Sequence, residues 1–498
     1  MIDQNIPTFI LLGRQLNDMA LTAGRKRQSA QTGYVHYFYH DSEDDAQQTI
    51  PLIENVYFAL ALLRTKTSEN VTEAKEILNR LLFFQNPTES NFPIYIHEYP
   101  HCKDRFLGVQ LLPAFFFILD EFDLVLGADL KQRLHLCVSK LLHSTLKALD
   151  EKKPSYALGI KIAAAAKAFG IYFEDLALEQ KGEQLLNQYL NMGLQPAWFI
   201  PTSIADICIA LQLAYASIQE SPWKDFWQHL IQTWHLPTCA YIGPGLKQHQ
   251  QADEPQPALY DLMMGYFSQG FSQRALRDAP YHLHAVLIRP IEEFFPVVTY
   301  PLSIKGLLNQ CPWTIYQQEK FAYSLIDSNA LPNPAHKNAF HPLAVVWGDK
   351  DKVHSFVCQE GNFDSFTFES NGHEIELVIQ LSPDYELDDR EKAREIAFFF
   401  DIEPDVKMTI HGEAATTFDL SEEFILKTPQ VELSLVISHT QGEGQFLGHL
   451  MQGNRSSQIH LKGAHRFKAY DWQLFFRTLR RSSTCQFKAS LRIQPCQK

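Results

Sequence analysis

The spacing of apolar residues changes once along the chain. Up to about residue 280, apolar side chains recur every three or four positions, the spacing of one buried stripe on a helix. From about residue 281, apolar and polar residues alternate, as in strands that bury one face. Gly170 is expected to end the helix over 155–169. The predicted helices cover 45–64, 71–84, 128–149, 155–169, 176–190, 202–218, 223–234 and 258–271.

The most apolar helical segment lies within residues 92–123 and follows a dense polar loop, residues 97–105. Its large residues include three consecutive phenylalanines, Phe115 to Phe117, and a segment apolar on nearly every face indicates a helix surrounded by other helices. Long loops rich in proline and aromatic residues alternate with short connections along this half. Such alternation predicts helical hairpins stacked in an incomplete α/α toroid, with the long loops gathered at one end around a cleft.

The second half predicts a large antiparallel β-sandwich of two sheets. Turn signals at 348–350, 360–362 and 371–372 lie where hairpins require positive φ. We therefore divide the chain into a toroid over 1–280 and a sandwich over 281–498. The predicted strands cover 285–288, 297–302, 313–326, 343–347, 354–358, 365–369, 375–381, 395–402, 407–410, 423–426, 431–439, 472–479 and 485–493.

Composition narrows the partners and the compartment. A net charge of -13 over 498 residues argues against nucleic acid or an anionic membrane as the main partner. The eight cysteines are scattered without a CxxC pair, which favours free thiols in a reducing compartment. The first residues make a poor signal peptide, and no apolar run reaches spanning length. We therefore expect a cytoplasmic protein; its oligomeric state is left open.

The domain order, a helical toroid followed by a β-sandwich, resembles the heparinase II/III-like and related polysaccharide lyases, alginate lyases among them. The resemblance covers almost the whole chain as architecture and includes no diagnostic motif. It implies a site in a cleft at the toroid mouth beside the sandwich. There a Tyr or His would remove a proton next to a uronic carboxylate, while Asn, Gln, His or Arg neutralises that carboxylate. Glycoside hydrolases and phosphorylases with toroids and sandwiches also exist.

The polar loop brings a base, an acid and a cation together. His101 or Tyr99 could abstract a proton, Glu98 could orient a histidine or act as an acid, and Arg105 could hold a substrate carboxylate with two hydrogen bonds. The structural alternative is that the loop caps a helix through Asp104 and that Arg105 forms a surface ion pair.

Aromatic residues supply candidate sugar-binding surfaces, because ring faces stack on the apolar C–H surfaces of sugars. One group lies in the segment 34–40, where His36, Tyr37 and Tyr39 interleave; the alternative is a β-like arm packed on the toroid. A second group begins candidate inner helices, from which a side chain would point into the cleft, although single aromatics at such places often belong to the core. This group is Tyr156, Trp198 and Tyr260.

No metal or cofactor is expected. His97 and His101 are separated by Pro100, which prevents a regular helix, and His282 and His284 would share a strand face without an evident third ligand. Walker, GxGxxG, GxSxG and HExxH motifs do not occur.

The favoured function is β-elimination on uronic-acid-containing polysaccharides or oligosaccharides. The first alternative is an inverting glycosidase that uses two carboxylates. The second is a non-catalytic protein that binds carbohydrate or protein. The hydrolytic pair would combine Glu98 or Asp104 with Asp206, Asp253, Glu254 or Asp261.

Overall fold

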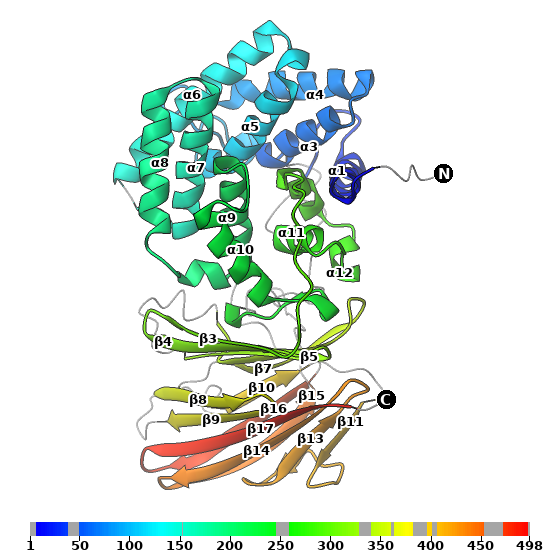
Figure 1. Ribbon diagram of the computed structural model, residues 1–498, viewed down its shortest axis with the longest axis vertical. Helices are drawn as coiled ribbons and strands as arrows, with labels where there is room; N and C mark the ends of the chain where they lie inside the picture. Colours follow the sequence, from blue (N-terminus) through cyan, green and yellow to red (C-terminus); the bar gives the residue numbers. More distant parts are fainter. Residues whose placement is uncertain are drawn as a thin grey trace.

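The protein consists of a ring of helices above two stacked β-sheets (Figure 1), as the computed structural model shows. This confirms the predicted α/α toroid followed by a large antiparallel sandwich. No helix in the described part of the chain is long and apolar enough to cross a membrane. The structure describes residues 6–37, 49–151, 153–245, 258–327, 340–359, 363–381, 396–400, 406–452 and 472–496.

Five helices form the inside of the ring and are buried along most of their length, because they are apolar on nearly every face. Each contacts the next, and α1 (Thr8–Arg27) together with the 3-10 helix η6 (Pro280–Leu287) packs between the last and the first of them. The inner helices are α3 (Leu52–Arg64), α5 (Leu107–Leu126), α7 (Tyr156–Tyr172), α9 (Pro201–Ala214) and α11 (Leu259–Phe267).

The outer helices bury a single face, and the first three of them pack as hairpins on the inner helix that precedes each, as the loop alternation predicted. Short helices occupy several of the connections. The outer helices are α4 (Ser68–Leu81), α6 (Ala128–Glu151), α8 (Leu176–Leu190) and α10 (Ser221–Thr233). The short elements are η1 (Leu82–Phe84), η2 (Ile96–Glu98), η3 (Pro196–Phe199), β1 (Trp234–His235), η4 (Leu236–Thr238), β2 (Ala240–Tyr241) and α12 (Gln273–Leu276).

Glycines allow close packing in the hairpin of α7 and α8. A Cβ atom at Gly182 would lie 2.2 Å from the backbone nitrogen of Lys167, and one at Gly170 would lie 2.3 Å from that of Glu179. The prediction that Gly170 ends a helix was wrong, because α7 continues to Tyr172. The glycine instead allows the two backbones to approach each other.

The β half contains a nine-stranded and a six-stranded antiparallel sheet. One face of the nine-stranded sheet packs on the helices through residues such as Trp313, Ile315 and Val346, and its other face packs on the six-stranded sheet. The molecule is therefore layered as helical ring, large sheet and small sheet (Figure 1).

The strand order of the large sheet is β12 (Thr417–Phe418), β15 (Gly444–Gln452), β16 (Trp472–Arg481), β10 (Ile396–Phe400), β7 (Val353–Gln359), β6 (Leu343–Gly348), β5 (Phe321–Ile326), β4 (Cys311–Gln317) and β3 (Leu302–Leu308). The order of the small sheet is β11 (Lys407–Ile410), β13 (Glu423–Lys427), β14 (Val431–Gln441), β17 (Cys485–Pro495), β9 (Glu374–Leu381) and β8 (Ser365–Asn371).

The start of the β half differs from the prediction. The stretch 285–288 belongs mostly to η6, a 3-10 helix with Pro280 in its first turn, and no strand occupies 297–301. Helical packing thus extends to Leu287, past the predicted boundary at residue 280, and the large sheet begins at Leu302. The predicted strand 313–326 is a hairpin of β4 and β5.

Two predicted turns are confirmed by positive φ angles, +115° at Gly348 and +62° at Gly372. The third, at 360–362, lies outside the described residues.

Candidate functional site

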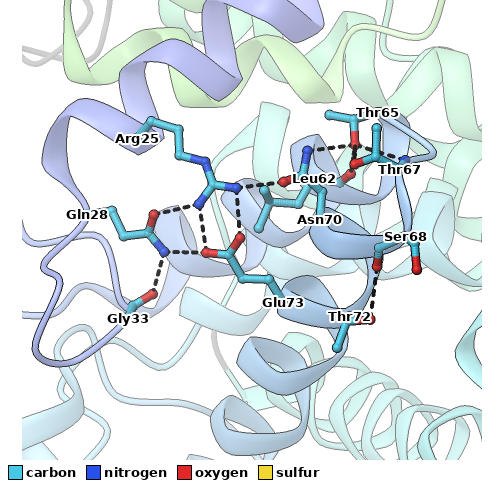
Figure 2. A network of polar contacts seen from close by, with 10 residues as sticks. All are labelled: Arg25, Gln28, Gly33, Leu62, Thr65, Thr67, Ser68, Asn70, Thr72 and Glu73. Atoms are coloured by element: carbon cyan, nitrogen blue, oxygen red, sulfur yellow. Dashed lines mark hydrogen bonds and ion pairs between the residues drawn. The ribbon is translucent and has the colours of Figure 1, made fainter.

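A short arm, residues 28–37, joins α1 to the ring and is anchored on α4 by a polar network (Figure 2). Both nitrogens at the tip of the Arg25 guanidinium lie 2.7 Å from the carboxylate oxygens of Glu73. Gln28 also donates to Glu73 and, at 3.0 Å, to the carbonyl oxygen of Gly33. Burial raises the pKa of Glu73, but the hydrogen bonds from Arg25 and Gln28 outweigh it and hold that pKa below its ordinary value. The anchoring carboxylate is therefore ionised at neutral pH.

A second anchor fixes the arm on α3. The side chain of Asn55, fully buried, accepts the backbone N–H of Val35 at 2.8 Å and donates to its carbonyl oxygen at 2.9 Å. Gln28 and Val35 also form an antiparallel bridge, so the arm is β-like and packs on the toroid, as the structural alternative predicted. This arrangement brings Tyr37 near Glu54, in the first turn of α3.

Five side chains come together beside the arm, and we call them the arm cluster: Tyr37, Glu54, Tyr57, Tyr281 and His284. The His284 Nε2 atom lies 3.5 Å from Glu54 Oε1, and the Glu54 side chain is only 2% exposed. The His284 ring contacts Tyr57 edge-on at a centroid distance of 4.9 Å and Tyr281 at 5.2 Å. Tyr281 is 41% exposed, so the cluster reaches the surface.

The phenols of the arm cluster are held in their protonated form. Burial, then the neighbouring Tyr281 and Glu54, raises the pKa of Tyr37 to about 12. Burial and Glu54 also raise the pKa of Tyr281, and they hold that of Tyr57 well above its usual range. At neutral pH the three hydroxyls are therefore proton donors. In the tautomer that carries its proton on Nε2, His284 donates to Glu54 and keeps a lone pair on Nδ1 that can accept a proton.

A buried ion pair lies next to the arm cluster, inside the ring. Lys161 on α7 donates to Gln110 Oε1 at 2.7 Å and is ion-paired with Asp206 on α9. Tyr57 donates to the backbone carbonyl oxygen of Gln110 at 2.8 Å and thereby connects the two groups. The Lys161 side chain is 1% exposed and that of Asp206 is 31% exposed, so the carboxylate is the accessible end of the pair.

The sequence reasoning missed Glu54, Lys161, Tyr281 and the site role of His284. The available signal was a single charge inside a helix that is otherwise apolar, as at Lys161 in LGIKIAAAA. A charge is rarely buried without a partner, so such a position points to a polar group on a neighbouring helix. Asp206 was considered only for the hydrolytic alternative.

In the polar loop, predicted to be catalytic, charged side chains form ion pairs and accept backbone N–H groups. Glu98 pairs with Lys103, and its other oxygen accepts the backbone N–H of Tyr95 at 3.3 Å. Arg105 lies 3.3 Å from Glu151. Among the described residues, no side-chain hydrogen bond or ion pair joins Tyr99 or His101 to Glu98 or Arg105. Asp104 accepts the backbone N–H of Phe106 at 2.9 Å, and Tyr99 packs edge-on against Phe84.

The candidate sugar-binding aromatics have different surroundings. Tyr260 is fully buried against Trp234 and Tyr241, and Trp198, 9% exposed, donates to the Tyr156 hydroxyl at 3.2 Å. Tyr260 is thus part of the core in this structure, and the hydroxyl of the less buried Tyr156 is occupied by Trp198. His36 lies on the arm, where its Nε2 atom is 2.8 Å from Thr32 Oγ1. Tyr39 lies outside the described residues, as do Asp253 and Glu254.

The histidine pair 282 and 284 does not share a strand face, because both residues lie on η6. His282 Nε2 contacts the carbonyl oxygen of Ala275 at 2.9 Å. Within the described ranges, no group of three or more His, Cys, Asp or Glu side chains is placed to hold a metal ion.

Comparison with solved structures shows the fold. A chondroitin AC lyase from Streptomyces coelicolor A3, in complex with chondroitin sulphate, matches 98% of this chain and 80% of its own length, with a TM-score of 0.54 and 10% identity. The heparan sulfate lyase of Pedobacter heparinus (98% and 83%, TM-score 0.40, 11% identity) and a heparinase III (98% and 84%, TM-score 0.39, 9% identity) are more distant in structure. No protein-family model matches the sequence, and no curated protein matches it by sequence.

The chain therefore has a polysaccharide lyase-like fold, shown by structure alone at about 10% identity.

Proposed function

We propose that the protein is a lyase that cleaves uronic-acid-containing glycans by β-elimination. The fold it shares with a chondroitin AC lyase supports this proposal. The main observation behind the proposal is the arm cluster. There the His284 imidazole contacts both the Glu54 carboxylate and the ring of Tyr281, a partly exposed tyrosine. β-Elimination needs these two groups, a base for the proton next to the uronate carboxylate and an acid for the leaving oxygen.

In the proposed reaction, His284 Nδ1 removes the C5 proton of the uronate. The electron pair of that C–H bond forms the C4–C5 double bond, and the C4–O bond to the leaving sugar breaks. The Tyr281 hydroxyl, kept protonated by its raised pKa, donates its proton to the leaving oxygen. Glu54 orients the imidazole and stabilises its charged form, after which His284 returns a proton to Tyr281. Arg27, whose charge acts on the nearby Tyr37, would neutralise the uronate carboxylate, which would share this guanidinium with Asp278, 3.4 Å from its Nη1 atom.

The polar loop remains the alternative location of the same chemistry, with His101 or Tyr99 as base, Arg105 on the carboxylate and Glu98 as the orienting acid. His36, Tyr37 and Tyr39 would then line the sugar-binding wall beside it. The two locations share no catalytic residue, so substitutions separate them.

The test is turnover of chondroitin, heparan sulfate, hyaluronan and alginate, followed by the ultraviolet absorbance of the unsaturated product. We expect His284→Ala and Tyr281→Phe each to lower kcat by about 100-fold or more, because each removes a proton-transfer group. The matched pair His101→Ala and Tyr99→Phe should change kcat less than about threefold. If the loop pair abolishes turnover and the arm pair does not, the loop is the active site.

Hydrolysis is the second candidate, favoured by two carboxylates on the inner helices, Glu54 and Asp206, that both act on the Tyr57 hydroxyl. Release of reducing sugar without the unsaturated product would support it. Saturable glycan binding without either product would identify a non-catalytic binding protein.

A further inference from the structure

A polar groove of about 870 Å³ lies on the outside of the ring, between α6 and the polar loop. Its basic lining comes from both walls: Lys103 and Arg105 from the loop, and Lys140, His143 and Lys147 from α6. The whole chain carries a net charge of -13, so this local excess of cations runs against the overall sign.

The two walls differ in how their charges are used. On the loop, Lys103 is paired with Glu98 and Arg105 with Glu151. On α6, no ion pair is found for Lys140 or Lys147 among the residues that the structure describes, and both are exposed. They are seven residues apart, so they lie on the same helix face, about 10.5 Å apart along the axis at 1.5 Å per residue.

Polar groups lie beside this pair of lysines. His143 and Ser144 are on the same face of α6 between them, and Ser139 also lines the groove. Ser144 Oγ donates to the carbonyl oxygen of Glu89 at 2.6 Å, which holds the opposite wall in place. An extended ligand with regularly spaced anionic groups would meet a cation at each end of the row and hydrogen-bonding groups between.

We propose that this groove binds an extended acidic glycan, with Lys140 and Lys147 pairing with its sulphate or carboxylate groups. The ligand class rests on the proposed function. Among the described residues, no Phe, Tyr or Trp side chain lines the groove, which disfavours a neutral sugar or single-stranded nucleic acid, because both are recognised by stacking on such rings. Glu89 and Glu151 beside the lysines disfavour a duplex with a phosphate on every residue.

The groove lies apart from the arm cluster. None of the arm-cluster residues lines it, and its helical wall is an outer helix of the ring (Figure 1). The proposed role is therefore to retain a long polymer, while cleavage takes place elsewhere.

The experiment measures the affinity of the full chain for a size-defined heparin or chondroitin sulfate oligosaccharide by isothermal titration calorimetry over a range of salt concentrations. We expect Lys140→Ala/Lys147→Ala to weaken binding about tenfold and to flatten its salt dependence, because two ionic contacts are lost. The matched control is Lys181→Ala/Lys224→Ala, which removes the same charge from two exposed helical lysines outside the groove. Circular dichroism checks that both variants fold.

Equal losses in the two double variants, or no saturable binding of either oligosaccharide to the unaltered chain, would overturn the proposal. Tighter binding of duplex DNA than of the glycans would overturn it as well. Turnover in the same samples separates this outcome from that of the proposed function. If the unaltered chain shows no turnover but the groove variant binds more weakly, the groove proposal is supported and the lyase proposal is rejected. If the chain shows turnover and the groove variant binds as tightly as the unaltered chain, the lyase proposal is supported and the groove proposal is rejected.

Discussion

At the scale of single residues, the ion pair of Lys161 and Asp206 places a buried ammonium group inside the ring of helices. Lys161→Met removes the ammonium and leaves Asp206 and Gln110 without their shared donor. We expect the free energy of unfolding to fall by roughly 2–4 kcal/mol, towards the lower part of the cost of breaking a buried pair because Asp206 is partly exposed.

Urea denaturation of a double-mutant cycle measures this coupling. Lys161→Met/Asp206→Leu should be destabilised by less than the sum of the two single variants, because the second change removes the orphaned charge. Lys181→Ala, an exposed change on α8, serves as the surface control. Strict additivity in the cycle would mean that the pair is not coupled.

The same residues explain why the site was harder to predict than the fold. Periodicity reports which face of a helix is buried, and Lys161 or Glu54 inside an apolar helix reads only as an exception to that pattern. Their meaning depends on partners from other elements, such as Asp206 and His284, which the sequence places far away. The polar loop, 97–105, was predicted to be catalytic for the opposite reason, because its polar residues are adjacent in sequence. In the structure their side chains form separate ion pairs, Glu98 with Lys103 and Arg105 with Glu151.

At the scale of elements, the contact between α7 and α8 depends on the missing Cβ of Gly182. In an isolated helix Gly182→Ala would stabilise by about 1 kcal/mol. Here the added Cβ would lie 2.2 Å from the backbone nitrogen of Lys167, so the helices must separate. We expect a net loss of about 2 kcal/mol or more in thermal or urea unfolding.

Gly270→Ala is the matched control, because no atom of the described residues, its two chain neighbours aside, lies within 4 Å of the added Cβ. It should change the free energy of unfolding by less than about 0.5 kcal/mol. A stabilised Gly182→Ala variant would show that helix propensity outweighs the close contact.

Most elements could be predicted because their hydrophobic period survives in the fold. The predicted helices match α3 to α11 within a few residues at most of their ends, whereas α1 was not recognised as a separate helix. The β4–β5 turn was missed because Gln318 to Lys320 contains no glycine or asparagine to mark it. The apolar stretch 285–288 was misread as a strand, because a short apolar run fits either period and its neighbours on α1 and α3 decide the outcome.

At the scale of the whole molecule, His235 joins the helical ring to the large sheet. Its Nε2 atom lies 2.6 Å from the carbonyl oxygen of Gln318, in the β4–β5 turn, and its Nδ1 atom lies 2.8 Å from Thr238 Oγ1. Burial lowers the pKa of His235 to about 4, and it lowers that of His229, which contacts the Trp198 carbonyl oxygen at 2.6 Å, to about 4 as well. The folded protein thus keeps both imidazoles neutral in mild acid.

The sign of the pH dependence follows from these lowered values. Between about pH 6.5 and pH 4 the unfolded chain binds protons at both histidines and the folded chain does not, so the free energy of unfolding falls as the pH falls. The expected loss is roughly 2–3 kcal/mol per histidine, from the shift in pKa at about 1.4 kcal/mol per unit. The pKa of Glu73 is lowered by Arg25 and Gln28, and that of Asp278 by Lys26 and Arg27. Their contributions are lost only as the pH falls through the ordinary values of these carboxyl groups, 4.5 and 3.8, and below, so they add to the loss at the acidic end of the window.

Urea unfolding at several pH values between about 7 and 4.5 tests this expectation. His235→Gln should lower the free energy of unfolding at pH 7, because the hydrogen bond to the Gln318 carbonyl oxygen is disturbed. It should also make that free energy fall less steeply with pH, because one of the titrating imidazoles is gone. His143→Gln, an exposed change on α6, should leave the slope as it is in the unaltered chain. If His235→Gln leaves the fall of the unfolding free energy with pH unchanged, protonation of this imidazole does not contribute to the acid sensitivity of the fold.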